Sequence, residues 1–393
     1  MGLPRSPRSP FYPSSASLQI LVFSLVAAAF STIYITQPVL PVLQAEFGVT
    51  ELAASLTVSA VILGIALANL PFGMLVDRFP VRPLILAGGL VIAACGFFCA
   101  VTKDLTHLVI ARFVQGLFVP SLTTCMVVYV VRTLPAERLN VVAGSYVSAT
   151  VAGGLGGRLL GGWIHTPAHW RYAFVTASVL LLAMTAAAVS RIPKDEERRE
   201  TAADAPGFLA LLSRGEVQRA CLVAFGAFFV FSSVFNYIPF YLAGPPFTAS
   251  TQVITLMYLS YLVGVFIGPA AGTLSNRIGN GATMAVGSVI FALSIAATFI
   301  PSMPAVAASL AGVCAGFFAV HSAAAGSLNR RLTASRGRAN SLYVLFYYLG
   351  GSLGINASGY AYRLAGWGGV AALGVLALAL PFAIGLKEMR EAR

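Results

Sequence analysis

Long apolar segments recur along almost the whole chain, and they constrain the fold more than any other feature. A helix needs about 20 apolar residues to cross a bilayer, and each of these segments is of about that length. We predict twelve membrane-spanning helices, at about 18–42, 52–76, 83–102, 106–131, 139–163, 171–191, 219–242, 250–275, 281–300, 304–329, 339–361 and 366–386. The pattern therefore favours an all-α membrane protein.

The composition excludes a water-soluble domain. Of the 393 residues, 58% are hydrophobic and 10% are charged, whereas a soluble protein has about 25% charged residues. Twelve spans with short connections occupy nearly all of the chain, so no room is left for a catalytic domain outside the membrane. The sequence contains no nucleotide-binding loop of the type G-x4-G-K-[ST], no nucleophile motif and no metal-ligand cluster. We therefore predict that the protein is not an enzyme and has no cofactor and no metal.

One long hydrophilic segment, residues 192–218, separates the spans into two sets of six. We predict two pseudo-symmetric six-helix bundles, 17–191 and 219–386, joined by a cytoplasmic linker at 192–218. Residues 1–16 are rich in Pro, Ser and Arg, so we predict a disordered cytoplasmic tail there. Residues 387–393 are predicted to form a second cytoplasmic tail.

The two halves also resemble each other in sequence. GMLVDRF at 73–79 matches GTLSNRI at 272–278, and STIYITQP at 31–38 matches SSVFNYIP at 232–239. The prolines at the end of the second match, Pro38 and Pro239, free backbone carbonyls and permit bending. These matches indicate a duplicated six-helix unit. Repeats related about the membrane normal place a binding site at their interface, near the middle of the membrane.

Basic residues are distributed unequally between the two sides of the predicted spans. Of the 25 Lys and Arg residues, twenty fall on the side of the termini and the linker, three fall opposite, and Arg112 and Arg158 fall within spans. Positive residues accumulate on the cytoplasmic side of membrane proteins, so both termini are predicted to be cytoplasmic. The net charge of +12 is then a topology signal, and we expect no nucleic-acid partner.

The segment GMLVDRFPVRP, 73–83, resembles the signature loop of the major facilitator superfamily, G-x-L-x-D-R-x-G-R. Gly73 is expected to allow close approach of helices. In that family the aspartate, here Asp77, caps the cytoplasmic end of the eleventh helix and holds a cytoplasmic gate shut. Pro80 and Val81 replace the usual glycine and arginine, and Asn276 replaces the second aspartate, so we expect a weaker lock. The alternative is a charged loop that only fixes topology, but the resemblance implies a gate formed by Gly73, Asp77, Arg78, Arg82, Asn276 and Arg277.

Two further motifs lie in the fourth and fifth spans. ARFVQG, 111–116, resembles the family's fourth-helix motif R-x-x-Q-G, which implies a role of Arg112 in proton coupling; the alternative is that its side chain reaches the outer membrane surface. Arg158 stands where antiporter-type facilitators have a proline. The fourth and fifth spans run antiparallel, so Arg112 and Arg158 are expected at similar depth. Two unpaired cations there need an anion, water or a mobile proton nearby. Five glycines match the antiporter spacing G-x8-G-x3-G-P-x2-G-G and are predicted to pack helices closely: Gly144, Gly153, Gly157, Gly161 and Gly162.

No aspartate or glutamate falls deep within a predicted span. A proton-driven carrier usually needs an intramembrane group that titrates near neutrality, which leaves His321 as a candidate; alternatively, His321 is a neutral packing residue. Proton coupling is thus assigned to Arg112, Asp77 and His321. The aromatic candidates for the substrate cavity have packing as their alternative, and the predicted cavity residues are Tyr34, Gln37, Arg112, Gln115, Arg158, Asn236, Tyr237, His321 and Tyr347.

These motifs cover both halves, so the resemblance to the superfamily extends over essentially the whole chain. Within the superfamily, the chain is similar to the YnfM-type branch, which is grouped with the twelve-helix drug:proton antiporters. The resemblance implies a monomeric, multi-pass transporter of the bacterial inner membrane that exports a small organic molecule by alternating access, coupled to protons. One alternative is a carrier of an organic anion bound by intramembrane arginines. Another, from a different class, is a non-transporting receptor or a membrane-embedded enzyme. The expected partners are the substrate, a proton and the lipid bilayer.

Overall fold

The computed structural model describes residues 15–133, 136–192, 207–332 and 335–391, and all regular elements in these ranges are helices. The N-terminal half consists of α1 (Ser15–Ile33), η1 (Gln37–Val39), α2 (Leu40–Phe47), α3 (Glu51–Arg78), α4 (Val81–Val101), α5 (Leu105–Thr133), α6 (Ala136–His165) and α7 (Trp170–Arg191). The C-terminal half consists of α8 (Phe208–Leu212), α9 (Gly215–Ala243), α10 (Thr251–Met257), η2 (Tyr258–Tyr261), α11 (Leu262–Ile278), α12 (Asn280–Ala297), α13 (Met303–Arg331), α14 (Arg336–Ala377) and α15 (Ala379–Glu391).

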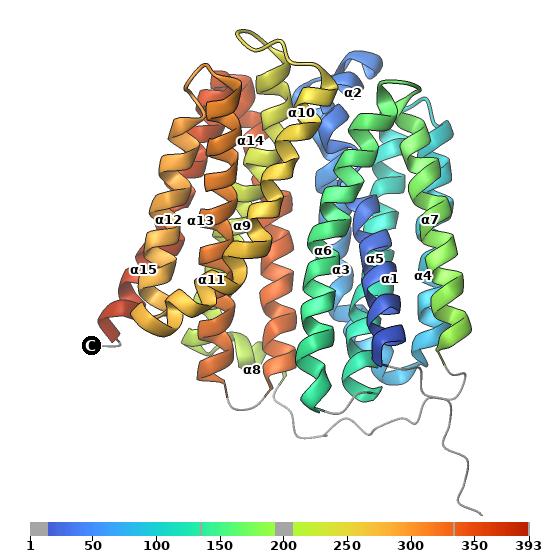
Figure 1. Ribbon diagram of the computed structural model, residues 1–393, viewed down its shortest axis with the longest axis vertical. Coiled ribbons are helices and arrows are strands. Elements are labelled where there is room, and N and C mark those ends of the chain that lie inside the picture. Colours follow the sequence, from blue (N-terminus) through green and yellow to red (C-terminus); the bar gives the residue numbers. More distant parts are fainter. Residues whose placement is uncertain (1–14, 134–135, 193–206, 333–334, 392–393) are drawn as a thin grey trace, which may run out of the picture.

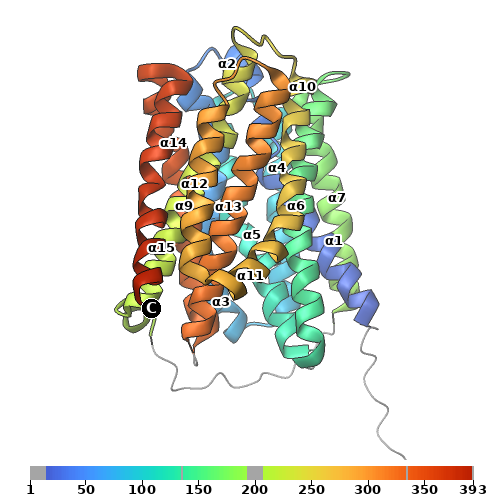
Figure 2. The ribbon, with the colours of Figure 1, turned by 60° about the vertical axis from the view of Figure 1, so that its left-hand side comes forward.

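The helices of each half pack mainly on one another and form two bundles that lie side by side (Figure 1). In the N-terminal bundle α3 packs on α5 and α1 packs on α6; in the C-terminal bundle α14 packs on α9 and α12 packs on α13. Between the bundles, α3 contacts α14, and α6 contacts α10 and α11. Figure 2 shows this second contact, with α6 beside α10 and α11.

Within the described ranges, ten helical segments are long and apolar enough to cross a membrane. One of them, Arg336–Glu391, contains two spans, because non-helical backbone at Ala365 and Gly366 bends α14. The glycine-containing helix α6 is not among the ten, although its 30 residues run alongside the others. With α6 and both parts of Arg336–Glu391 included, twelve helical rods cross the molecule, as the apolar segments predict.

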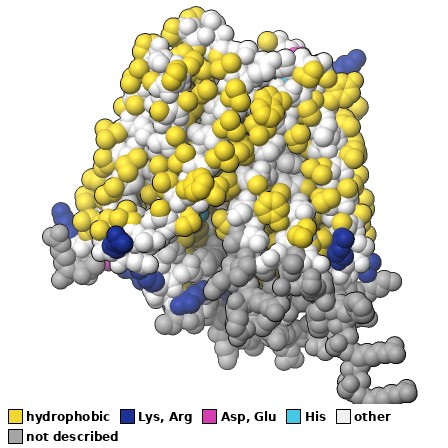
Figure 3. Space-filling view, in the orientation of Figure 1, with side chains coloured by type: hydrophobic (Ala, Val, Ile, Leu, Met, Phe, Trp, Pro, Cys, Tyr) yellow, Lys and Arg dark blue, Asp and Glu magenta, His cyan; other side chains and the backbone are white. Residues whose placement is uncertain are grey.

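The two ends of the bundles differ in charge. We call the end with the start of α1, α8 and the end of α15 the lower end, and the end with α2 the upper end (Figure 1). On the face seen in Figure 3, hydrophobic side chains cover most of the height of the helices and most Lys and Arg side chains lie near the lower margin. Three basic residues that the sequence places on the opposite side lie at the upper end: Lys103 follows α4, Arg171 begins α7, and Arg363 precedes the bend of α14 at Ala365 and Gly366.

Matching N-caps begin the second span of each half. Thr50 Oγ1 accepts a hydrogen bond from the Ala53 N–H at 3.2 Å, and Ser250 Oγ accepts one from the Val253 N–H at 3.4 Å. Each cap satisfies an amide in the first turn that has no partner within the helix. The caps are 200 positions apart (250 minus 50), which agrees with the internal repeat.

The first span is broken next to Pro38. α1 ends at Ile33, and the Gln37 N–H donates to the Tyr34 carbonyl at 3.1 Å at the start of η1. Carbonyl groups in the last turn of a helix have no intrahelical partner, so those of Thr32 and Ile33 are available to side-chain donors. The matching Pro239 has a different outcome, because α9 continues through it to Ala243.

Some predicted boundaries differ from the structure. The predicted linker, 192–218, contains the short helix α8, and α9 already begins at Gly215. The predicted C-terminal tail, 387–393, is helical as far as Glu391, because α15 extends the last span. Of the predicted N-terminal tail, 1–16, residues 15 and 16 begin α1 and the rest lies outside the described residues.

Candidate substrate site between the two bundles

Arg158 of α6 connects the two bundles in the upper half of the molecule. Its Nε donates to Gln37 Oε1 at 2.8 Å and its Nη1 donates to the Gly154 carbonyl at 2.7 Å, both within the N-terminal bundle. Its Nη2 donates to the hydroxyl of Tyr261, in η2 of the C-terminal bundle, at 2.8 Å. One guanidinium therefore contacts both halves, and a movement of one bundle against the other must change these bonds.

Three tyrosine rings surround the same guanidinium. Its central carbon lies 3.9 Å from the ring centre of Tyr34, 4.2 Å from that of Tyr261 and 5.3 Å from that of Tyr258. These distances allow cation–π attraction, which is stronger where water is excluded, and Arg158 is only 2% exposed. In the described part of the chain no ion pair includes Arg158. The cation is therefore held by dipoles and ring faces, without a carboxylate.

An aromatic surface extends from this site through the C-terminal bundle. The rings of Phe231 and Phe317 stack with centres 3.9 Å apart, and those of Phe228 and Tyr347 stack at 3.8 Å. Phe231 in turn contacts Tyr261, with ring centres 5.3 Å apart. Phe228, Phe231 and Phe317 are only 2–3% exposed, so in this conformation the rings pack on one another.

His321 lies at the lower part of the aromatic surface. Its ring stacks on Phe317 at 5.7 Å between ring centres, and its Nδ1 lies 2.9 Å from the Tyr343 hydroxyl. Which of the two atoms donates depends on the tautomer. The predicted cavity residues His321 and Tyr347 are neighbours, with ring centres 5.3 Å apart. The structure thus places the candidate proton site next to the aromatic surface.

Arg112 differs from Arg158, because all of its hydrogen bonds lie within the N-terminal bundle. Its Nη1 donates to the Thr32 carbonyl at 2.6 Å and to Gln115 Oε1 at 2.7 Å, and its Nη2 donates to the Ile33 carbonyl. Its Nε donates to the Thr57 carbonyl of α3 at 2.9 Å. Arg112 therefore ties the broken end of α1 to α3 and α5. It is fully buried, so the alternative that its side chain reaches the outer membrane surface is wrong.

Two other polar candidates, Asn236 and Tyr237, lie in α9 of the C-terminal bundle. Asn236 Nδ2 donates to Ser55 Oγ of α3 at 2.8 Å, which is another polar contact between the bundles. The Tyr237 hydroxyl instead donates to the Ile355 carbonyl at 3.0 Å, within its own bundle. Two buried polar atoms, Gln37 Nε2 and Asn236 Oδ1, have no hydrogen-bond partner among the described residues. A substrate with a polar group would satisfy such atoms.

The predicted gate residues lie at the lower end, and the hydrogen bonds that Asp77 and Asn276 accept each stay within one bundle. Asp77 Oδ1 accepts from Arg132 Nη2 of α5 at 3.0 Å. Asn276 Oδ1 accepts from Arg330 Nη1 of α13 at 3.3 Å. Arg78, Arg82 and Arg277 are at least partly exposed. The expectation that Gly73 allows close helix approach is wrong here, because a Cβ atom on it would meet no atom within 4 Å.

Four of the predicted packing glycines lie where a Cβ atom would collide with a neighbouring helix. At Gly153 and Gly157 it would meet the backbone of α1, at Gly161 the backbone of Ile35 just beyond α1, and at Gly162 the side chain of Thr255 of α10 in the other bundle. The glycines thus set the distances between α6 and two other helices. Gly144 lies in α6, but its surroundings are outside the described residues.

Sequence reasoning did not find the C-terminal partners of Arg158. Tyr258 and Tyr261 contribute a ring and a hydroxyl to its surroundings, yet they lie in an apolar span with no motif around them. Their spacing of three residues places both on one face of the short 3-10 helix η2. The unusual arginine at 158 indicates that partners must exist, but the linear sequence does not name them.

Comparisons with known proteins concern the family and the fold of the chain. A family model described as Major Facilitator Superfamily matches residues 22–355. The inner membrane transport protein YnfM of Escherichia coli (strain K12) is 27% identical over 383 residues, which cover 96% of this chain and 92% of that protein. An uncharacterized MFS-type transporter of Bacillus subtilis (strain 168), YybF, is 27% identical over 347 residues, covering 85% and 84%. The crystal structure of a bacterial homologue of the human lysosomal transporter Spinster, inward-facing and unoccupied, matches with a TM-score of 0.79 and 15% identity, covering 96% of this chain and 97% of that one. At this identity the structural likeness concerns the fold.

Proposed function

The chain belongs to the Major Facilitator Superfamily and is a multi-pass membrane transporter, and from this premise we propose that it exports a small organic molecule in exchange for protons by alternating access. The predicted family resemblance and fold class are thereby confirmed. We further propose a bacterial inner-membrane location with the lower end in the cytoplasm. The excess of Lys and Arg on that side supports this orientation.

The observation that carries the proposal is the position of Arg158 between the bundles. Substrate sites of transporters built from repeats lie at the interface of the repeats, and Arg158 bonds to Gln37 on one side and Tyr261 on the other. Once the bundles separate, the aromatic rings next to it become available to the apolar part of a substrate. When the bundles rock, the residues of this site separate or approach, which gives the site access to one side at a time.

For proton coupling we propose His321 as the titrating group. The described Asp and Glu residues lie at the two ends of the molecule, whereas His321 lies within α13 beside Tyr343. Everted vesicles should accumulate the substrate when a proton gradient is imposed, and a protonophore should stop the accumulation. His321→Asn is expected to reduce gradient-driven accumulation to that of vesicles without the protein, while exchange down a substrate gradient persists. If the protonophore leaves the flux of the unaltered protein unchanged, proton coupling is wrong.

A second candidate, an organic anion as substrate, is favoured by the buried guanidinium that has no carboxylate partner. An anion that reaches Arg158 would form charge-assisted hydrogen bonds with its fork of donors. Arg158→Gln should then weaken the binding of an anionic ligand by about 2 kcal/mol or more, which is about thirtyfold in Kd. Isothermal titration of the purified protein with aromatic carboxylates measures this change.

The matched control for this measurement is Arg363→Gln, which removes an exposed arginine near the bend of α14. It changes the net charge by the same amount but leaves the interface intact, so it should bind like the unaltered protein. Equal Kd values for Arg158→Gln and Arg363→Gln would exclude an anionic substrate. The remaining proposal would then be the export of a neutral or cationic molecule.

A further inference from the structure

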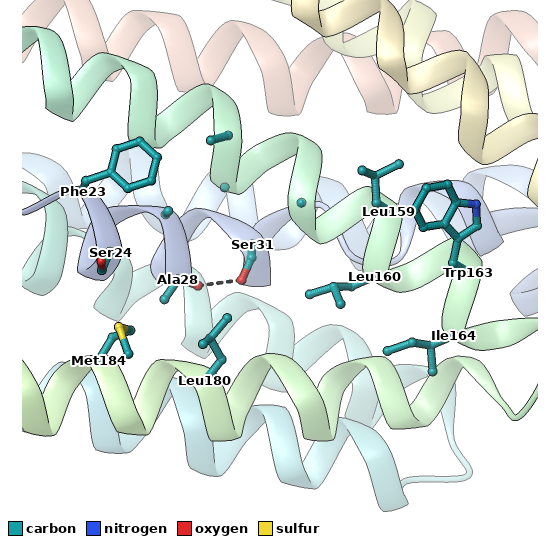
Figure 4. A pocket seen from close by; sticks show the side chains of 14 residues that line it. Phe23, Ser24, Ala28, Ser31, Leu159, Leu160, Trp163, Ile164, Leu180 and Met184 are labelled. Carbon is teal, nitrogen blue, oxygen red and sulfur yellow. Dashed lines mark hydrogen bonds between the residues drawn. The ribbon is translucent and has the colours of Figure 1, made fainter. Parts of the chain in front are cut away.

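A groove lies away from the interface of the bundles, on the face of the N-terminal bundle where α1, α6 and α7 meet. Its volume is about 610 Å³, and its walls include Phe23 of α1, Leu160 of α6, and Leu180 and Met184 of α7 (Figure 4). The walls are almost entirely hydrocarbon. The hydroxyl of Ser31, in the groove, already donates to the Ala28 carbonyl at 2.8 Å, as the dashed line in Figure 4 shows.

The groove opens toward the lipid bilayer. Phe23 is 39% exposed, Leu180 42% and Trp163 47%, and all three belong to helices that cross the membrane. Apolar side chains on the outer face of such helices contact acyl chains. The medium in front of the groove is therefore hydrocarbon, which matches its walls.

Close packing of α1 and α6 prevents the protein from filling this groove with its own side chains. Gly153 lies so near the backbone of Ala27 that a Cβ atom there would collide with it. Gly156, one turn further along α6 and facing the groove, has open space, because a Cβ atom would meet nothing within 4 Å. Small residues are thus required at the contact of the two helices and leave a depression beside it. A hydrocarbon chain in this depression gains dispersion contacts along its whole length.

The length of the groove corresponds to one leaflet. It extends along α6 from Ala152 to Ile164, which is about 18 Å of helix at 1.5 Å per residue. Half of a hydrocarbon core about 30 Å thick is about 15 Å. Trp163 lies near the upper end of α6, where tryptophan side chains typically meet lipid headgroups. Among the described residues none accepts a hydrogen bond from its indole N–H, so this donor is available to a headgroup or glycerol oxygen.

We propose that the groove binds one acyl chain of a phospholipid from the upper leaflet, with the Trp163 indole N–H facing the headgroup region. The chain packs on the contact between α1 and α6. The other side of the same contact carries Arg158, whose Nη1 donates to the Gly154 carbonyl. The bound lipid therefore stabilises the helix pair that positions the arginine.

Native mass spectrometry of protein released from vesicles of palmitoyl-oleoyl-phosphatidylcholine tests the proposal. The unaltered protein should retain one phospholipid, and Gly156→Leu, whose new side chain occupies the groove, should lose it. Gly272→Leu is the matched control, because Gly272 of α11 also has open space around its Cβ position but lies in the other bundle. Equal lipid retention by Gly156→Leu and Gly272→Leu overturns the proposal. If Gly156→Leu does not fold, Ala152→Leu fills the same groove from an exposed position.

A fluorescence measurement provides an independent check. Of the three tryptophans, Trp170 and Trp367 are 1% and 4% exposed, whereas Trp163 is 47% exposed. Phosphatidylcholine with brominated acyl chains should therefore quench mainly Trp163. Quenching at a low fraction of brominated lipid should be strong in Gly272→Leu and weak in Gly156→Leu. The same quenching curve for both variants contradicts a lipid that is held in the groove.

Discussion

Arg112→Gln is expected to destabilise the protein by about 3 kcal/mol or more and to abolish transport. The substitution removes the donors for the carbonyls of Thr32, Ile33 and Thr57, and each buried acceptor left without a partner costs about 1–3 kcal/mol. Relief of a buried charge offsets part of this cost. Because Arg112 holds the broken end of α1, the substitution should also displace Tyr34 and Gln37, which follow the break and contact Arg158.

Thermal unfolding in detergent measures this loss. Its readout is the height of the monodisperse peak in size-exclusion chromatography after heating. Arg112→Lys should be intermediate, because one ammonium group cannot reach all of the acceptors of the guanidinium fork. Arg363→Gln, at an exposed position, is the control and should unfold at the temperature of the unaltered protein. If Arg112→Gln unfolds at that temperature as well, Arg112 does not hold the helices together, and a direct role in transport must be reconsidered.

The second large effect is expected for Gly157→Ala, a change of one methyl group. The new Cβ atom would lie 2.8 Å from the carbonyl carbon and 2.9 Å from the Cα atom of Ser31, and a backbone cannot rotate away as a side chain can. α1 and α6 must separate, at a cost of about 2–3 kcal/mol by analogy with overpacked cores. Transport should fall with the yield of folded protein, and Gly157→Leu should prevent folding.

The neighbouring glycine is a strict control for this prediction. Gly156→Ala adds the same methyl group one residue away, where the Cβ position is open. Since alanine favours a helix over glycine by about 0.5–1 kcal/mol, Gly156→Ala should be as stable as the unaltered protein or slightly more stable. Melting curves of the two variants in the same detergent give the comparison. Equal losses would mean that the contact between α1 and α6 is not the origin of the effect.

The sequence predicts the number and the approximate ends of the spans well, because the thickness of the bilayer fixes how long an apolar segment must be. Local interruptions are less predictable. Pro38 coincides with a break, while the matching Pro239 lies within the continuous helix α9. The difference depends on whether neighbouring groups satisfy the freed carbonyls. Arg112 provides such a group for α1, and its reach across the bundle cannot be deduced from spacing along the chain.

The two intramembrane arginines show the corresponding limit at the candidate site. Their similar predicted depth follows from their positions in antiparallel spans, but depth does not specify the direction in which a side chain points around the helix axis. Arg112 bonds within its own bundle, and Arg158 bonds across to Tyr261. That distinction arises from tertiary packing. The role of His321 in proton coupling and that of Asp77 in a gate stay predictions.

The guanidinium that three phenol rings enclose between the bundles has an electrical consequence. No neighbouring anion in the described ranges cancels its charge, so a rearrangement that shifts Arg158 relative to the membrane performs work against the transmembrane voltage. A full elementary charge that crosses 100 mV corresponds to about 2.3 kcal/mol. The return of the empty carrier should therefore depend on membrane potential. An anion bound to Arg158 would neutralise its charge, so the movement of the loaded carrier should not depend on membrane potential.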